Sequence, residues 1–354
     1  MRIVTPGIIA ATIILSLSGC SSSNPLAPSI LNPDIFPFKT VSNIGSIIDP
    51  TNGDRNPYGL AIALSDTGLF TSGDLVVCNF NNSSNVQGTG TTVEYIHPAS
   101  GSTVHRFAQD ATLLGCGSVS VLPDDHVAVT AKLANDVVIY DPSASTKVTL
   151  SGSPFNGPWG STYANSLTKP AIYVSNANDG SLVRINVLGP TSYSTETIAT
   201  GFSVNGGAPG NIFAPYGMAY NPANDTLYIA ESNSNKLIAI ANVSSVGAGG
   251  ITVSGSDSTF GGTSGSSAHA VLSGAPLNNP LGASLLVNGN IVVANSGDNL
   301  MIDVTPGGKV VGTMSLDAGA AGALFSLAAV PGTFQQQIVY FNDSNDNTVK
   351  VLTP

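Results

Sequence analysis

Short apolar stretches separated by polar turns recur along this chain from about residue 55 onward. Six of them share one form, in which an apolar run ends in a small residue and then, in most copies, a polar one. A strand presents alternate side chains to its two faces, so a run that is apolar throughout predicts a strand buried on both faces. The six stretches are LVVCN (75–79), HVAVTA (126–131), AIYVSN (171–176), TLYIAE (226–231), NIVVAN (290–295) and QIVYFN (337–342).

Each stretch belongs to a longer repeat. A turn that ends in Gly and another short apolar strand come before it, and a third strand follows after a turn rich in Asn or Asp. The third strands are TTVEYI (91–96), NDVVIYD (135–141), SLVRINV (181–187), KLIAIA (236–241), NLMIDV (299–304) and NTVKVL (347–352). Fourth strands follow in five repeats: STVHRFA (102–108), TKVTLSG (146–152), TETIAT (195–200), GITVSG (250–255) and KVVGTMS (309–315).

The two ends of the chain complete this pattern. The sixth repeat has no fourth strand, yet KTVSNI (39–44) precedes the first repeat and belongs to no other. Four strands in each repeat of roughly 40 to 60 residues suit propeller blades. An N-terminal strand that completes the last blade would close the ring and protect its edges. We therefore predict an all-β, six-bladed β-propeller of four-stranded blades. A solenoid is disfavoured because neither end resembles a capping repeat.

The turns before the first strands carry a family resemblance. Four of them read Asn56-Pro57-Tyr58-Gly59, Pro158-Trp159-Gly160, Ala214-Pro215-Tyr216-Gly217 and Asn279-Pro280-Leu281-Gly282. Together with strands that close on small-Asn or small-acid, this P-x-G pattern resembles the NHL-repeat propellers over about residues 38–354. Repeats 2 and 6 depart from it, with Leu114-Gly115-Cys116-Gly117 and Ala321-Gly322-Ala323-Leu324. The resemblance implies a fold, and fold does not imply function.

Composition narrows the class of partner. Charged residues make up only 9% of the chain, while 39 Gly and 22 Pro supply turns, which favours short strands over salt-bridged surface helices. The formal net charge is −10, and the 11 Lys and Arg residues form no basic run. Because phosphate binding needs clustered cations, we expect no nucleic-acid partner.

The N-terminus predicts export and a lipid anchor. Arg2 precedes an apolar run, Ile8 to Leu17, that is too short to span a bilayer. The following LSGC, which ends at Cys20, resembles the lipobox of bacterial lipoproteins and implies cleavage before Cys20 and its lipidation. An ordinary secretory signal with an incidental Cys is the alternative.

These features divide the chain into three parts. We expect a lipoprotein signal peptide at residues 1–19, a lipidated Cys with a Ser- and Pro-rich tether at 20–36, and the propeller at 37–354. Ser21 rather than Asp follows Cys20. In enterobacteria-like sorting this implies the outer membrane, so the expected location is the bacterial cell envelope, on its outer-membrane or periplasmic side.

The two remaining cysteines leave two alternatives open. In an exported protein, Cys78 and Cys116 can pair in a disulfide. Both also lie within apolar strand patterns, so two separate buried thiols explain them as well.

The candidate site follows from the propeller geometry. In such propellers the loop into the first strand and the loop leaving the second strand lie on one face around the channel, and there rings can stack on a ligand while amides orient it. Alternatively, the Asn side chains merely cap turns. The candidates are Tyr58, Trp159 and Tyr216 from the turns, and Asn79, Asn176, Glu231, Asn295 and Asn342 from the strand ends. Glu231 stands where four repeats have Asn and one has Ala131.

A more distant resemblance suggests an enzyme. SMP-30/gluconolactonase propellers hold a divalent cation in the channel with Glu, Asn and Asp. The matching ligands here would be Asn176, Glu231, Asn295 and Asp343, whose oxygens suit a cation such as Ca²⁺. The family's early Glu-Gly-Pro motif is missing, and Asn replaces most of its channel acids.

Streptogramin lyases and amidating-enzyme lyases are propellers that use histidines around a metal. The four histidines here, His97, His105, His126 and His269, do not converge in the repeat register. No nucleophile elbow, phosphate loop or dinucleotide fingerprint occurs in the needed context either. We therefore predict a lipid-anchored binding or scaffolding module for a protein, peptide or glycan, without catalytic residues or cofactor. A metal-dependent hydrolase or lactonase is the alternative.

Overall fold

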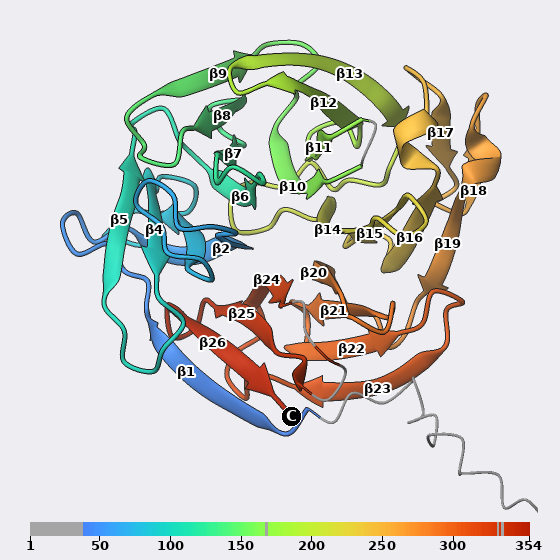
Figure 1. Cartoon of the computed structure of the whole chain (residues 1–354). Coiled ribbons are helices and arrows are strands. Elements are labelled where there is room, and N and C mark those ends of the chain that lie inside the picture. Colours follow the sequence, from blue (N-terminus) through green and yellow to red (C-terminus); the bar gives the residue numbers. More distant parts are fainter. Residues whose placement is uncertain (1–37, 167–168, 331–332, 334–335) are drawn as a thin grey trace, which may run out of the picture. The chain divides into compact units, whose positions relative to one another are not determined.

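The computed structural model describes residues 38–354 except 167–168, 331–332 and 334–335. The predicted signal peptide, the lipobox Cys20 and the tether lie outside the described residues. Within them, the strands form six sheets arranged in a ring (Figure 1). The all-β, six-bladed propeller predicted from the repeats is confirmed.

Within each blade, the strands follow one another in space from the central channel to the outer edge. Blade 1 contains β2 (Arg55–Ile62), β3 (Leu75–Asn81), β4 (Thr92–Ile96) and β5 (Val104–Gln109); blade 2 contains β6 (Cys116–Val121), β7 (Val127–Ala131), β8 (Asp136–Tyr140) and β9 (Lys147–Ser151); blade 3 contains β10 (Pro158–Ala164), β11 (Ala171–Asn176), β12 (Leu182–Gly189) and β13 (Ser192–Thr200). Blade 4 contains β14 (Pro215–Asn221), β15 (Thr226–Glu231), β16 (Lys236–Ala241) and β19 (Ala268–Ser273); blade 5 contains β20 (Pro280–Leu285), β21 (Ile291–Asn295), β22 (Leu300–Val304) and β23 (Val310–Ser315); blade 6 contains β24 (Leu324–Ala329), β25 (Val339–Asp343), β26 (Thr348–Thr353) and β1 (Thr40–Ser46).

The N-terminal strand closes the ring as predicted. β1 pairs antiparallel with β26, from Thr40 opposite Thr353 to Ser46 opposite Thr348. The outermost strand of blade 6 therefore comes from the opposite end of the chain to its other three strands. The six first strands contact one another in sequence around the channel, and β24 of blade 6 also contacts β2 of blade 1.

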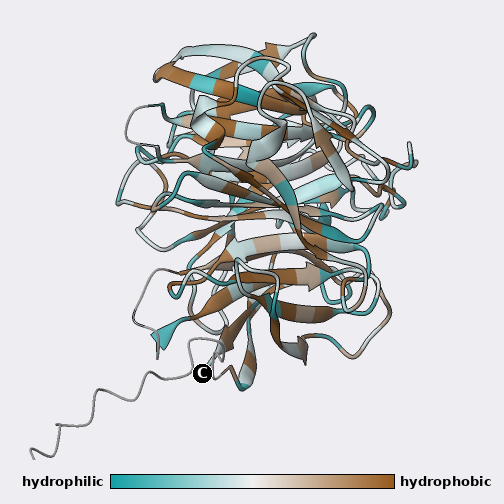
Figure 2. Ribbon diagram, turned by 90° about the vertical axis from the view of Figure 1, so that its right-hand side faces the viewer, coloured by the Kyte–Doolittle hydropathy of each residue, from teal (hydrophilic) through white to brown (hydrophobic). Residues whose placement is uncertain are grey.

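Apolar side chains fill the spaces between the blades. Each of six buried clusters combines residues of two neighbouring blades within the described chain. Figure 2 shows the hydrophobic residues along the strands and the more hydrophilic ones in the loops. Because a middle strand meets a neighbouring blade on both faces, it is apolar on both, as its sequence pattern predicts. None of the helices in the described residues is long and apolar enough to cross a membrane.

The first strands approach one another most closely at the glycine of the P-x-G turn. A Cβ added to Gly160 would lie 1.9 Å from the carbonyl oxygen of Tyr216 in the next blade, and one added to Gly217 would lie 1.9 Å from that of Leu281. Both distances are far inside van der Waals contact. The neighbouring backbone therefore requires glycine here, whereas the φ of these residues does not.

Hydrogen bonds from the second strands tie neighbouring blades together. The Thr130 hydroxyl donates to the carbonyl oxygen of Trp159 at 2.7 Å, and the Ser175 hydroxyl donates to that of Pro215 at 2.6 Å. These donors stand one residue before the end of the second strand, and each acceptor lies on the first strand of the next blade. Such bonds to buried carbonyls stabilise the ring and satisfy backbone groups that a bulge leaves unpaired.

Blade 1 carries a covalent link at the same place. Cys78 stands one residue before Asn79 on β3 and forms a disulfide with Cys116 on β6, with a Cα–Cα distance of 6.0 Å. The pairing that the sequence left open is thus present. It joins blades 1 and 2. At the equivalent positions, a hydrogen bond joins blades 2 and 3, and another joins blades 3 and 4.

The predicted fourth strand of blade 4 is wrong. GITVSG forms β17 (Ile251–Ser254), which pairs in parallel with β13 of blade 3 and antiparallel with β18 (Thr259–Gly261). The strand prediction itself holds, because Ile251 and Val253 are buried. After β16 the chain turns at η1 (Val243–Ser245), whose carbonyls accept hydrogen bonds from Arg184 of blade 3. This contact directs the chain to blade 3. After η2 (Gly265–Ser267), β19 returns to complete blade 4.

We expect Gly217→Ala to destabilise the propeller by about 3 kcal/mol or more, because the methyl group would overlap a backbone oxygen that cannot move without displacing β20. Gly312→Ala on the outer strand β23 is the matched control, since a Cβ there has nothing within 4 Å. Urea unfolding followed by circular dichroism measures both. Equal stability of the two variants would contradict the close-approach interpretation.

Candidate functional site

Side chains from the first strands close the channel. Every first strand carries a bulge at its P-x-G position or the equivalent position, and a bulge re-aims the side chain it carries. In blade 2 this position is Gly117. The side chains from the other five blades pack together with Phe80 in what we call the aromatic plug: Tyr58, Phe80, Trp159, Tyr216, Leu281 and Phe325.

The plug is held by ring stacking and by hydrogen bonds of Tyr216 across the channel, to Gly117 and to Ser326. The Tyr58 ring stacks on Phe325 with centroids 3.7 Å apart and on Phe80 with centroids 4.2 Å apart. The Tyr216 hydroxyl donates to the carbonyl oxygen of Gly117, two blades away, at 2.6 Å. Burial raises the pKa of Tyr58 and of Tyr216 above the ordinary phenol range, so neither serves as a base at neutral pH.

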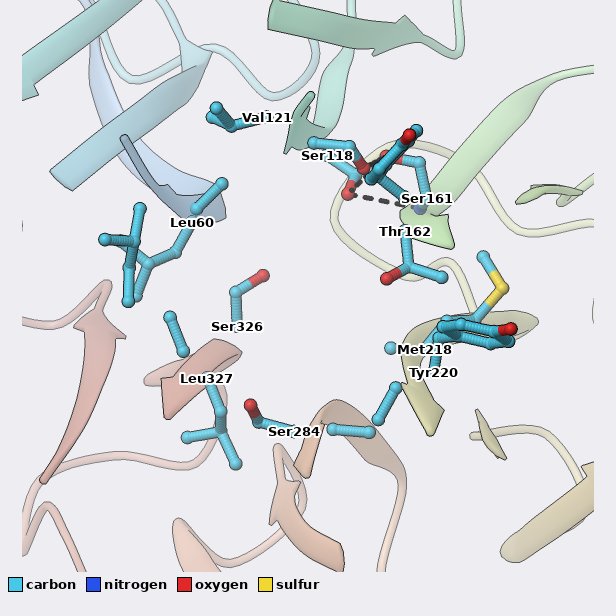
Figure 3. A pocket seen from close by; sticks show the side chains of 18 of the residues that line it. Leu60, Ser118, Val121, Ser161, Thr162, Met218, Tyr220, Ser284, Ser326 and Leu327 are labelled. Atoms are coloured by element: carbon cyan, nitrogen blue, oxygen red, sulfur yellow. Dashed lines mark hydrogen bonds between the residues drawn. The ribbon is translucent and has the colours of Figure 1, made fainter. Parts of the chain in front are cut away.

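A cavity adjoins the plug, because Tyr216 of the plug is among its lining residues. Figure 3 shows other side chains that line it. This channel cavity has a volume of about 550 Å³ and is lined by residues of all six first strands. Leu60, Met218 and Leu327 supply apolar wall, while Thr162, Ser284 and Ser326 present hydroxyls (Figure 3).

Part of the hydroxyl lining is already bonded within the protein. Ser161 Oγ lies 2.8 Å from Ser120 Oγ and donates to Ser118 Oγ at 3.1 Å. Ser284 Oγ accepts the backbone N–H of Ala329 at 3.0 Å, which leaves its own proton for another acceptor. Hydroxyls both donate and accept, so this lining can match amide or hydroxyl groups of a ligand.

The channel cavity has no charge. Among its lining residues that the structure describes there is no Asp, Glu, Lys, Arg, His or Cys. Tyr220 titrates far from neutrality, because burial and its hydrogen bond to Asp225 raise its pKa to about 12. General acid–base or nucleophilic catalysis needs a group with a suitable pKa or an adjacent base. The cavity as lined can bind and orient a ligand but offers no such group.

Two adjoining depressions lie on the other side of the plug. One, of about 320 Å³, is lined by Tyr58, Trp159 and Phe325 among others, and the second, of about 410 Å³, by Tyr58, Phe325 and several Asn side chains. Their residues come from loops that enter first strands and leave second strands. Tyr58 and Trp159 thus lie together at these depressions, whereas Tyr216 lines the channel cavity.

The predicted amides lie at strand ends and are buried. Asn79 Nδ2 donates to the carbonyl oxygen of Ile47 at 3.1 Å, Asn176 Nδ2 to that of Pro154 at 2.9 Å, and Asn295 Nδ2 to that of Pro276 at 2.9 Å. These bonds hold the loop that leads into each first strand. The structure does not bring the three side chains together, because they lie on blades 1, 3 and 5. Their role in ligand binding stays a prediction.

Blade 6 is shifted by one residue relative to the predicted register. Asp343, not Asn342, stands opposite the start of the first strand, as Glu231 does in blade 4. Asn342 takes the place of Thr130 and Ser175, and its Nδ2 donates to the carbonyl oxygen of Tyr58 at 2.9 Å. The register slips because Asn342 and Asp343 are both polar, and the sequence alone does not say which one ends the pattern.

Glu231 binds backbone and a neighbouring acid. Its carboxylate accepts the N–H groups of Asn233 at 2.9 Å and Ser234 at 2.7 Å, which caps the turn after β15. The Ser234 hydroxyl also donates to Asp257, in the loop between β17 and β18. Burial, followed by a hydrogen bond with Asp257, raises the pKa of Glu231 to about 8. Glu231 therefore ties blade 4 to the inserted β17–β18 hairpin.

The candidate metal ligands come from four blades and lie outside the channel cavity. Asn176, Glu231, Asn295 and Asp343 lie on four different blades, and none lines the channel cavity. Asn176 and Asn295 each turn their amide nitrogen to a backbone carbonyl. A cation site needs several oxygen ligands converging on one point, so a metal site at these four residues stays a prediction.

One carboxylate cluster occurs elsewhere in the described residues. Asp317, Asp343 and Asp346 place oxygens within 4.8 Å of one another. Lys350 forms ion pairs with two members of this cluster, because its Nζ donates to Asp343 and to Asp346, each at 2.5 Å. The ammonium group supplies the positive charge that the cluster requires.

Sequence reasoning missed two features of the site. Phe325 stands at the P-x-G position of blade 6, where no Pro or Gly marks it. The hydroxyls of the channel cavity also went unnoticed, although a Ser follows closely after that position in CGSVSV, PWGST, PLGAS and LFS. That recurrence is the signal that would have found them.

The fold is shared with solved structures of low identity. A gluconolactonase from Xanthomonas campestris has a TM-score of 0.56 and 12% identity, over 85% of this chain and 86% of its own. A catalytically inactive histidine-to-alanine variant of virginiamycin B lyase from Staphylococcus aureus, with quinupristin, has a TM-score of 0.53 and 13% identity, over 88% and 84%. A chain of the nidogen/laminin complex has a TM-score of 0.51 and 10% identity, over 74% and 80%.

These similarities establish the fold alone, since proteins with different activities share it. No protein family matches the sequence, and no curated protein matches it either. The NHL-repeat resemblance stays a prediction.

Glu231→Gln should reduce the loss of stability with rising pH. The folded chain keeps the Glu231 proton up to pH of about 8, whereas an unfolded chain releases it near pH 4.5. Folding takes up a proton in this window, so the stabilisation is complete below it and is lost as pH rises through it. Urea unfolding between pH 5 and pH 8 should therefore show a smaller decline in the free energy of unfolding of the variant. The difference in slope should correspond to up to about one bound proton.

Glu196→Gln is the control for this measurement. The hydrogen bond from Arg184 lowers the pKa of Glu196, so its removal should not flatten the decline between pH 5 and pH 8. An identical pH dependence in wild type and Glu231→Gln would contradict the assignment of a raised pKa to Glu231.

Proposed function

We propose that this chain is a non-catalytic binding module that holds an uncharged segment of a protein or peptide in the channel cavity. The observation that carries the proposal is the lining itself. All six first strands contribute to it, and its described residues are apolar or bear hydroxyls, apart from the carboxamide of Asn165, without a charged group. A peptide backbone alternates N–H and C=O groups, which hydroxyls satisfy in either sense, while Leu60, Met218 and Leu327 contact its apolar side chains.

Apolar residues at the mouth of the channel cavity favour a partner larger than a metabolite. Leu64, Pro123 and Pro222 lie where the cavity lining reaches the turns, and 54% of the Leu64 surface is exposed. Apolar groups at the rim of a concave site favour contact with a second surface. A glycan, also expected from the sequence, suits the opposite side of the plug better.

The enzymatic alternatives find less support. The gluconolactonase neighbour suggests a metal-dependent lactonase, but none of the candidate ligands of this chain lines the channel cavity. The catalytically inactive lyase variant carries alanine in place of a histidine. None of the four histidines of this chain lines the channel cavity or the two depressions.

We also propose that the module is exported and anchored through a lipid on Cys20. The lipobox supports the anchor, and the Cys78–Cys116 disulfide suits an oxidising compartment. Mass spectrometry of the mature N-terminus should find a diacylglycerol thioether on Cys20, and Cys20→Ala should release the protein from membranes. An unmodified Cys20 in membrane-bound protein would contradict the anchor.

Filling the channel cavity should abolish peptide binding. Thr162 points into the cavity (Figure 3), so Thr162→Phe should weaken binding of capped, uncharged peptides from a random library at least tenfold, as measured by titration calorimetry. The control is Thr149→Phe, which places the same ring on the exposed outer strand β9. Peptides that carry one Asp or Lys should bind more weakly than their neutral counterparts, because a charge buried without a partner is costly.

Two outcomes would contradict the binding module. One is equal binding by Thr162→Phe and wild type. The other is hydrolysis of a lactone such as δ-gluconolactone that requires Ca²⁺, Zn²⁺ or Mn²⁺ and is lost in Glu231→Gln or Asp343→Asn.

A further inference from the structure

We propose that the face on the other side of the aromatic plug carries a second binding site, for a neutral oligosaccharide. The depressions of about 320 and 410 Å³ share Tyr58, Gly210, Ala321, Gly322 and Phe325. They therefore form one continuous hollow, which we call the carboxamide groove. Its size falls in the range of small-ligand clefts. The plug separates the groove from the channel cavity, so the two sites can be tested independently.

Carboxamide side chains line the groove. They come from blades 1, 5 and 6 and from the loops between them: Asn56, Asn85, Gln87, Asn278, Asn279, Asn345 and Asn347. Among the described lining residues, Arg55 alone is charged. A carboxamide offers two N–H donors and a carbonyl acceptor, which match the paired donor and acceptor character of sugar hydroxyls. An anionic ligand would need more cationic groups than one arginine.

Hydrogen bonds within the protein orient several of these carboxamides. Gln87 Oε1 accepts a hydrogen bond from Asn56 Nδ2 at 3.4 Å, Asn347 Oδ1 accepts the backbone N–H of Asn56 at 2.9 Å, and Asn85 Oδ1 accepts from Asn81 Nδ2 at 2.8 Å. In each case the oxygen is used within the protein. The NH₂ groups of Gln87, Asn347 and Asn85 have no partner among the described residues. The internal bonds thus preorganise donors for a ligand, which lowers the entropy lost on binding.

The floor of the groove is aromatic. Phe325 is half-buried and lines both depressions, and its ring rests on Tyr58, which rests on Phe80. Such a stacked column is rigid, and an aromatic ring provides an apolar surface against which the C–H face of a pyranose can pack.

Trp159 lies where the plug meets the groove. Its indole Nε1–H is buried and has no acceptor in the described part of the chain, and Trp159 lines the groove. A buried donor without an acceptor is costly and rare. The Trp159 ring contributes packing surface at the groove, while its Nε1–H lies beneath that surface.

The test uses the full chain and three neutral probes: maltotriose, cellotriose and tri-N-acetylchitotriose. Trp159 is the only tryptophan, so its fluorescence reports on the groove, and saturation-transfer NMR detects binding without relying on it. At least one probe should change the fluorescence saturably. The double variant Gln87→Glu/Asn347→Asp should bind it at least tenfold more weakly, because both substitutions keep the internal acceptor oxygens and replace only the NH₂ donors.

Two further variants separate this site from the channel cavity. Asn224→Asp changes an exposed carboxamide in the turn between β14 and β15, next to Pro222 of the cavity lining, and should leave oligosaccharide binding unchanged. Thr162→Phe should do the same while it abolishes peptide binding. Failure of all three probes to bind would overturn the proposal. So would unchanged binding by the double variant, or loss of binding in Thr162→Phe, which would place the sugar in the channel cavity.

Discussion

The propeller depends on how closely its six inner strands approach one another. At Gly160 and Gly217 the backbone of the next blade occupies the space that a side chain would need. This proximity makes the channel narrow, and in a narrow channel five side chains of the first strands, together with Phe80, are enough to form the aromatic plug. It also brings the ends of the second strands within reach of the neighbouring first strand, where Thr130, Ser175 and Asn342 donate hydrogen bonds. A cavity on one side and a groove on the other are consequences of that single packing constraint.

Several acidic side chains among the described residues are engaged by backbone N–H groups. The chain has a formal net charge of −10, yet the described lining of the channel cavity is neutral. Carboxylates that accept backbone N–H groups occur throughout the blades, at Asp49, Asp125, Asp141, Glu231 and Asp343. A carboxylate used in this way has fewer lone pairs for a substrate or a cation. The channel cavity contains no carboxylate among its described lining residues.

The sequence predicted the fold because the repeats constrain it six times over. Strand order, blade number and the closing strand all follow from hydrophobic periodicity, which local burial determines. The fourth strand of blade 4 shows the limit of this reasoning. The alternation in GITVSG correctly indicates a strand, but the free edge of β13 and the contact of Arg184 with η1 determine its partner, and those lie far away in the sequence. The site shows the same limit, since Asn79 and Asn176 were identified by position while their bonding to loop carbonyls arises only in the folded ring.

The pairing of β1 with β26 has a consequence for the order of synthesis. The first strand of the propeller to be made is the outer strand of the last blade, and its partner ends at Thr353. The ring therefore cannot close until nearly the whole chain has been translated, and in an exported protein until both ends have crossed the membrane. Until then β1 has no partner in its final blade, and the cell must keep an unclosed propeller from pairing its exposed edge with another chain.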